Sequence, residues 1–117
     1  MDEALENPGN IVISSFYEYP YLSHLCLEPM NCTAHFRPGK AGAKEHIEMW
    51  LPTQSGPGFK KLAQEHYGLD ADQFTIHVKR MGGSFGRRTS GEYMCEAIEL
   101  SKLSGRPVKL TWSREDS

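Results

Sequence analysis

The fold is decided by residues 74–91, which read Phe74-Thr-Ile-His-Val-Lys-Arg-Met-Gly-Gly-Ser-Phe-Gly-Arg-Arg-Thr-Ser-Gly91. Polar and apolar side chains alternate over residues 74–80, which is typical of a strand. A glycine-rich turn follows, and Thr89 and Glu92 have the spacing of a capping box at the start of a helix over 91–104. Gly105 and Pro107 would end that helix, and residues 108–112 are predicted to form another strand.

Two further strands and a helix are predicted upstream of this stretch. Residues 31–37 and 45–51 indicate a hairpin, joined by a loop over 38–43 that is rich in glycine and proline. Pro57 suits the first turn of a helix, apolar residues then recur at helical spacing, and Gly68 is a natural end. Residues 10–19 are rich in β-branched and aromatic side chains and are predicted as a strand that Pro20 ends. Residues 21–29 are expected to be a connector that packs against the core.

This order of strands, helix, strand, helix and strand predicts an α+β fold. Each strand–helix–strand unit returns its second strand to one mixed sheet, so we expect two crossover helices, right-handed by the usual rule. The length of 117 residues suits one modest core, and residues 1–117 are expected to form a single domain. Because the chain stops directly after a strand, we also expect it to be a fragment of a longer protein.

Composition excludes some classes of protein. Hydrophobic residues make up 38% and charged residues 24% of the chain. The net charge of −2 argues against a protein that mainly coats nucleic acid or an anionic membrane. No apolar run approaches the roughly 20 residues of a membrane span, and the acidic start has no signal-peptide pattern. The compartment stays open between periplasm and cytoplasm. The three cysteines are an odd, sparse set, which indicates free thiols.

The turn over residues 82–91 is the first candidate site. Glycines permit positive φ and a close approach of the backbone to a ligand, and the free N–H groups of a helix start attract anions. Arg87 and Arg88 could add charge-assisted bonds to a phosphate. The glycine spacing matches neither a Rossmann fingerprint nor a P-loop. The alternative is a tight turn with exposed arginines, and Phe85 within it would either pack over the turn or face a cavity.

A second candidate lies at the end of the 45–51 strand. Gln54 follows this strand and precedes the helix start, a place where ligand groups cluster in α/β sheets. Its amide offers one acceptor and two donors, although a glutamine in a loop is commonly only solvated. If the two strands that precede residues 52–57 and 82–91 are parallel, both turns lie at the same edge of the sheet.

A metal site made of protein ligands is not expected. Histidine and cysteine gather over residues 24–35, but the spacing matches no Cys-x-x-Cys knuckle. On a strand over 31–37, Cys32 and His35 would face opposite sides. A hydrolase elbow of the Gly-x-Ser-x-Gly type is absent from the sequence.

Three segments together resemble one family, the molybdopterin-binding large subunit of xanthine dehydrogenases and aldehyde oxidases. They are Leu27-Glu-Pro-Met-Asn-Cys-Thr-Ala34, Pro52-Thr-Gln54 and Met81-Gly-Gly-Ser-Phe-Gly-Arg-Arg88. The first segment and the Gly-Arg-Arg ending of the third are most similar to the bacterial branch that includes isoquinoline 1-oxidoreductase and related aldehyde dehydrogenases. The similarity extends from about Tyr17 to Asp116.

The resemblance implies roles for these residues. Gln54 would lie beside the molybdenum and bond an oxygen of the metal centre. Gly83, Phe85 and Gly86 would lie against the pterin, within a cofactor-binding set completed by Gly82, Ser84, Arg87 and Arg88. The cofactor is expected to be molybdopterin, as the cytosine dinucleotide, and its dithiolene would hold the molybdenum, so that no residue here is a metal ligand.

The resemblance also implies what this chain lacks. The catalytic glutamate of the family lies near the end of a much longer subunit, so no catalytic residue is expected among residues 1–117. The implied partners are the rest of the large subunit, an iron–sulfur small subunit and a small-molecule substrate. The implied reaction is the oxidation of aldehydes or N-heterocycles with water as the oxygen source, and the isolated chain is predicted to be inactive. The alternative is a small stand-alone module that binds a phosphorylated ligand.

Substrate class is also implied. Purine-oxidising relatives follow the Gly-Gly-x-Phe-Gly turn with Gly-Lys and then a glutamate that bonds the purine. The corresponding positions here are Arg87, Arg88 and Thr89. Thr89 cannot supply the negative charge, so an aldehyde or a less polar heterocycle is expected over xanthine.

Overall fold

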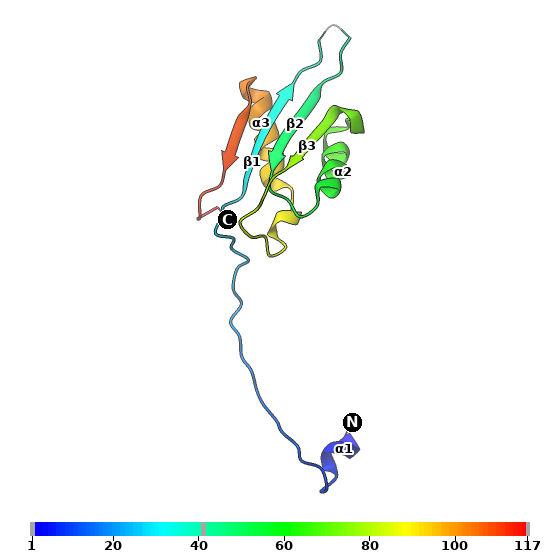
Figure 1. Cartoon of the computed structure of the whole chain (residues 1–117), viewed down its shortest axis with the longest axis vertical. Helices are drawn as coiled ribbons and strands as arrows, with labels where there is room; N and C mark the ends of the chain where they lie inside the picture. The colour runs from blue at the N-terminus through cyan, green and yellow to red at the C-terminus, as the bar shows by residue number, and fades with distance from the viewer. Residues whose placement is uncertain (1, 41, 117) are drawn as a thin grey trace.

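A computed structural model describes residues 2–40 and 42–116 (Figure 1). Ala41, in the loop predicted over 38–43, lies outside the described residues, as do Met1 and Ser117. The elements are α1 (Asp2–Glu6), β1 (Asn31–Arg37), β2 (His46–Leu51), α2 (Gly56–Tyr67), η1 (Ala71–Gln73), β3 (Phe74–Val78), η2 (Arg87–Thr89), α3 (Glu92–Ser104) and β4 (Val108–Thr111).

The strands form one mixed sheet in the order β3-β2-β1-β4. β1 is antiparallel to both of its neighbours, whereas β2 and β3 are parallel, with Leu51 opposite Val78 at their ends. The α2 helix connects β2 to β3, and α3 connects β3 to β4 on the far edge. This confirms the predicted α+β fold with a mixed sheet and two crossover helices.

The core lies between the sheet and the two long helices. On β2 every second residue is buried, and β1 follows the same strand period at Cys32 and Ala34, with Phe36 partly buried. These side chains form one cluster with the buried faces of α2 and α3. The cluster comprises Cys26, Met30, Cys32, Ala34, Ile47, Met49, Leu51, Phe59, Ala63, Phe74, Tyr93, Met94, Ala97 and Ile98.

The boundaries of α2 have local causes. The Ser55 hydroxyl accepts a hydrogen bond from the Gly58 N–H at 3.2 Å, and Pro57 lies in the first turn, where it needs no acceptor. Gly68 ends the helix at a φ of 65°, in the left-handed region. The α3 helix ends in the same way at Gly105.

The strand predicted over residues 10–19 is wrong. These residues form no strand, and Figure 1 shows them running away from the sheet as an extended tail. Ile11 is 94% exposed and Phe16 87% exposed. A β-rich segment becomes a strand only against a partner, and no partner strand for it lies within the described residues. The expected packing of residues 21–29 holds at Cys26 but fails at Tyr21, Leu22 and Leu27, which are exposed.

The capping box predicted at the start of α3 is also wrong. The N-cap residue is Gly91, and it makes no side-chain capping bond. Thr89 belongs to the 3₁₀ turn η2, and its hydroxyl donates to the Gly86 carbonyl at 2.6 Å. The extra turn before α3 moves Thr89 out of capping reach of Glu92.

Candidate functional site

The two candidate turns meet at one edge of the sheet. Because β2 and β3 are parallel, residues 52–55 and 79–91 leave the same end of neighbouring strands. The Lys79 N–H donates to the Leu51 carbonyl at 3.0 Å, which extends the pairing into the turns. The Arg88 carbonyl then accepts from the Thr53 hydroxyl at 3.2 Å and from the Gln54 N–H at 3.4 Å. The prediction that both turns lie together is confirmed.

The glycine turn over residues 82–86 presents free main-chain donors. Its φ angles are 104° at Gly83, 47° at Phe85 and 82° at Gly86, all in the range that favours glycine. No described residue accepts a hydrogen bond from the N–H groups of residues 83–86. Successive N–H groups in such a turn form a concave site for an anion or another oxygen acceptor.

Phe85 lies exposed on this turn. Its side chain is 67% exposed, and its ring edge approaches Gly83, with Cε2 3.6 Å from where a Cβ would stand. A non-glycine residue at positive φ is strained, and such strain is concentrated at functional sites. The ring therefore packs partly over the turn and leaves most of its surface available for contact.

Gln54 presents a free amide beside the turn. Its residue is exposed, and within the described chain its side-chain amide makes no hydrogen bond. Its main chain is held by Arg88, and the adjacent Thr53 is buried. The side chain is thus an unengaged donor and acceptor on an anchored backbone.

The two arginines have different environments. Arg87 is half-buried and turns toward α3: its Nη1 donates to the Ser90 hydroxyl at 2.7 Å and lies 3.6 Å from the Glu92 carboxylate. Its guanidinium also lies 5.3 Å from the ring centre of Trp112, a cation–π distance. Ser84, half-buried, accepts the Arg87 N–H at its carbonyl. The contacts with Ser90, Glu92 and Trp112 engage the Arg87 guanidinium, and the side chain remains 30% exposed.

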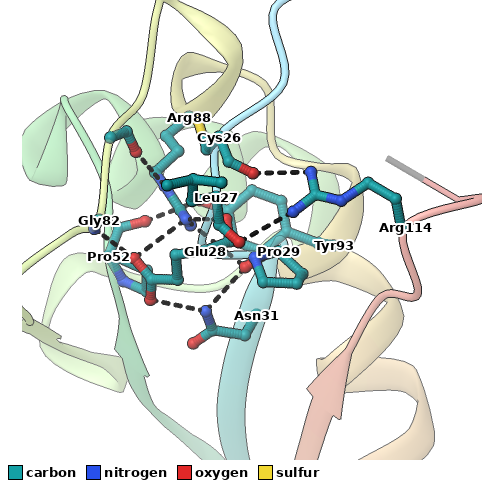
Figure 2. Close-up of polar contacts among 11 residues, drawn as sticks. Cys26, Leu27, Glu28, Pro29, Asn31, Pro52, Gly82, Arg88, Tyr93 and Arg114 are labelled. Atoms are coloured by element: carbon teal, nitrogen blue, oxygen red, sulfur yellow. Dashed lines mark hydrogen bonds and ion pairs between the residues drawn. The ribbon is translucent and has the colours of Figure 1, made fainter.

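Arg88 points into the protein. Its side chain is fully buried, and its Nε donates to the Gly83 carbonyl at 2.9 Å. Its Nη2 donates to the Glu28 carbonyl at 2.9 Å and lies 3.1 Å from the Glu28 carboxylate (Figure 2). Main-chain and carboxylate oxygens of the chain itself therefore bind this guanidinium.

Glu28 is a site residue to which sequence reasoning gave no role. Its carboxylate accepts from the Gly82 N–H and, at 2.9 Å, from the Asn31 amide. Partial burial raises the pKa of this carboxyl, but these two bonds and the Arg88 charge outweigh it and hold the pKa below its usual value. Glu28 lies in the motif over residues 27–34, yet two of its partners, Gly82 and Arg88, lie more than fifty residues away in sequence.

The described residues contain neither a cluster of metal-ligating side chains nor a membrane-spanning helix. No group of three or more histidine, cysteine or acidic side chains there could hold a metal ion. Cys32 is fully buried and His35 is half-buried on the opposite face of β1. No described helix has the length and apolarity to cross a bilayer.

Comparison with known proteins identifies the family. The molybdopterin cofactor-binding domain family matches residues 1–117. The chain is a member of that family. Its relatives include the isoquinoline 1-oxidoreductase beta subunit of Brevundimonas diminuta, 35% identical over 59% of this chain and 9% of the relative. Aldehyde oxidase 2 of Rattus norvegicus is 30% identical over 99% of this chain and 8% of the relative.

Solved structures share the fold of this molybdopterin cofactor-binding domain. Quinoline 2-oxidoreductase from Pseudomonas putida 86 matches 80% of this chain and 12% of its own, with a TM-score of 0.64 at 22% identity. The chain thus spans about a tenth of the relatives it matches. These comparisons confirm the resemblance to the xanthine dehydrogenase and aldehyde oxidase family, and they give no support to a stand-alone module for a phosphorylated ligand.

Proposed function

We propose that this domain forms one wall of the molybdenum cofactor site in a hydroxylase that oxidises aldehydes or N-heterocycles, and that it catalyses nothing alone. The observation that carries the proposal is the meeting of two sets of free donors at one sheet edge. The N–H groups of residues 83–86 and the Gln54 amide lack partners among the described residues and lie on turns that bond each other. Family membership supports the same cofactor.

The donor set suits a pterin cofactor. Main-chain N–H groups in a positive-φ turn match the oxygens of a pterin or a phosphate, and a Cβ on Gly86 would point into open space. When bound, the cofactor supplies the oxidation–reduction chemistry, with water as the oxygen source. In this proposal Gln54 donates a positioned hydrogen bond to the cofactor, and the exposed Phe85 ring covers it and excludes water.

The remaining roles follow from position. Gly82, Gly83 and Ser84 form the first part of the turn and Gly86 its last positive-φ residue, so all four belong to the proposed cofactor contact surface. Arg87 keeps a half-exposed guanidinium that could reach a phosphate of the cytosine dinucleotide form. Arg88 joins the two turns through its carbonyl, and its guanidinium is bonded within the chain and is not free to bind the cofactor.

The partners are proposed from the size of the relatives. Because the chain spans about a tenth of them, the rest of a large subunit would supply the other walls of the site and the catalytic acid–base residue. The name of the bacterial relative, a beta subunit, fits a separate electron-transfer subunit, which we propose to carry iron–sulfur clusters. The names of these two relatives also fit an aldehyde or N-heterocycle as substrate.

Metal analysis and a dye-linked assay would test this function. The full-length protein that contains this chain should hold molybdenum and pterin and oxidise an aromatic aldehyde or isoquinoline. The isolated 117 residues should fold yet hold neither, because a pterin dinucleotide needs burial on several sides. Absence of molybdenum from the purified full-length protein would refute the proposal, and turnover by the isolated chain would refute the need for other walls.

A further inference from the structure

An ion pair between the buried Arg88 and the partly exposed Glu28 ties the segment over residues 26–29 to the glycine turn. The Arg88 guanidinium donates to the Gly83 carbonyl through Nε and to the Glu28 carbonyl through Nη2, both at 2.9 Å. The same Nη2 lies 3.1 Å from the Glu28 carboxylate. Figure 2 shows the guanidinium between the two segments, bonded to both main chains at once.

Glu28, the other member of the ion pair, also holds the turn. Its carboxylate accepts the Gly82 N–H, so Gly82 and Gly83, the first two residues of the turn, are each bonded to one partner of the pair. A Cβ on Gly82 would stand 2.8 Å from the Glu28 Cβ, which is shorter than the non-bonded contacts that Cβ atoms make in proteins. The glycine is therefore required for this contact with Glu28.

We propose that Glu28 and Arg88 are positioning residues of the cofactor site, acting through the main chain of the turn. This inference rests on the function proposed above. With the Gly82 N–H and the Gly83 carbonyl both held, the free N–H groups of residues 83–86 keep one orientation. Arg88 also anchors the second turn, because its carbonyl accepts from Thr53 and Gln54. One residue thus sets the positions of both sets of donors.

Stability alone does not explain the arginine. Its Nη1 is buried and makes no hydrogen bond of normal geometry with the described residues. A buried guanidinium that leaves one donor unpaired carries a desolvation cost, so it is a poor stabiliser compared with apolar packing of similar volume. What an apolar side chain could not do at this position is bind two main-chain carbonyls in a defined fork.

Arg114 offers a matched control. Its two terminal nitrogens donate to the carbonyls of Cys26 and Leu27, at 2.7 and 2.8 Å. It therefore holds the same 26–29 segment as Arg88, yet none of its hydrogen bonds within the described chain reaches the glycine turn. We therefore expect Arg114→Met to loosen the segment and to spare the turn.

The test uses the full-length cofactor-loaded enzyme with Glu28→Gln, Arg88→Met, Arg88→Lys and Arg114→Met. We expect Glu28→Gln and Arg88→Met to lower kcat about 10- to 100-fold with KM changed less than about threefold. Arg88→Lys should recover little, because an ammonium cannot reproduce the fork. Arg114→Met should stay within about twofold of the unmodified enzyme.

A second readout does not depend on activity. Amide hydrogen exchange over residues 82–86 in the cofactor-free full-length protein should accelerate in Glu28→Gln and Arg88→Met, and not in Arg114→Met. If Arg88→Met does not fold, Glu28→Gln, which keeps the shape of the side chain, carries the test. Unchanged exchange at the turn, or equal losses of kcat in all variants, would overturn the inference. An unmodified enzyme without molybdenum would instead refute the proposed function.

Discussion

The Thr53 hydroxyl donates a hydrogen bond to the Arg88 main-chain carbonyl at 3.2 Å, joining two turns that lie 35 residues apart in sequence. Thr53 is buried, so this bond is shielded from water and holds the turns in one relative position. The bond brings the free Gln54 amide and the glycine turn to one place.

Gln54→Ala in the full-length enzyme should reduce turnover by about two to three orders of magnitude, because one positioned donor to the reacting group is lost. Folding should be nearly unchanged, since the side chain is exposed. Steady-state kinetics and thermal unfolding measure both effects. Gln64→Ala, the same substitution on α2, is the control and should be silent. A normal rate with full cofactor content would make Gln54 an ordinary loop residue.

Glu28→Gln should change how stability depends on pH. In the folded chain the Glu28 pKa lies below its usual value of 4.5, so its contribution to stability is present above that pH and is lost as the pH falls through the lowered pKa. The unfolding free energies of the unmodified and Glu28→Gln chains should therefore converge as the pH falls below 4.5 and through the lowered pKa. Denaturant titrations at several pH values measure this. Glu18→Gln, on the exposed tail, should show no such convergence.

The three cysteines should react with a thiol reagent in a defined order. Burial, with a smaller effect of nearby Cys95, raises the pKa of Cys32 to about 12, and Cys26 is 2% exposed. The thiolate is the reactive form, so the raised pKa and the burial of Cys32 both protect it, and burial shields Cys26 from the reagent. Both should resist labelling until the chain unfolds. Cys95, half-buried, should react first although burial also raises its pKa. Mass spectrometry of labelled peptides gives the order, and rapid native labelling of Cys32 would contradict this packing.

The full-length enzyme should prefer an aromatic aldehyde or isoquinoline to xanthine. Thr89 occupies the position expected for the purine-binding glutamate, and its hydroxyl is already bonded to the Gly86 carbonyl at 2.6 Å. Purine N–H groups left without partners would cost about 1–3 kcal/mol for each buried group. Turnover per molybdenum on the three substrates measures the preference. Xanthine as the best substrate would show that another residue supplies the acid.

Local patterns predicted much of the fold. The strand over 31–37 matches β1, and α2 and α3 begin and end within about a residue of expectation, because caps and side-chain periods are short-range signals. The tail over residues 10–19 was predicted as a strand because β-propensity carries no information about whether a partner strand is present.

The site was predictable only in part. The parallel order of β2 and β3 was enough to bring Gln54 and the glycine turn together. The burial of the Arg88 side chain beside Glu28 could not be predicted, because the two residues are 60 positions apart and no local pattern marks an arginine that will be buried. The 3₁₀ turn that contains Thr89 and precedes α3 was missed for a similar reason: a capping-box spacing does not reveal an extra turn.

The most direct measurement is an experimental structure of the full-length enzyme with its cofactor bound. We predict that the N–H groups of residues 83–86 and the Gln54 amide lie within hydrogen-bond distance of the cofactor, with the Phe85 ring against it. A molybdopterin bound elsewhere, with these donors facing solvent or another part of the protein, would contradict it.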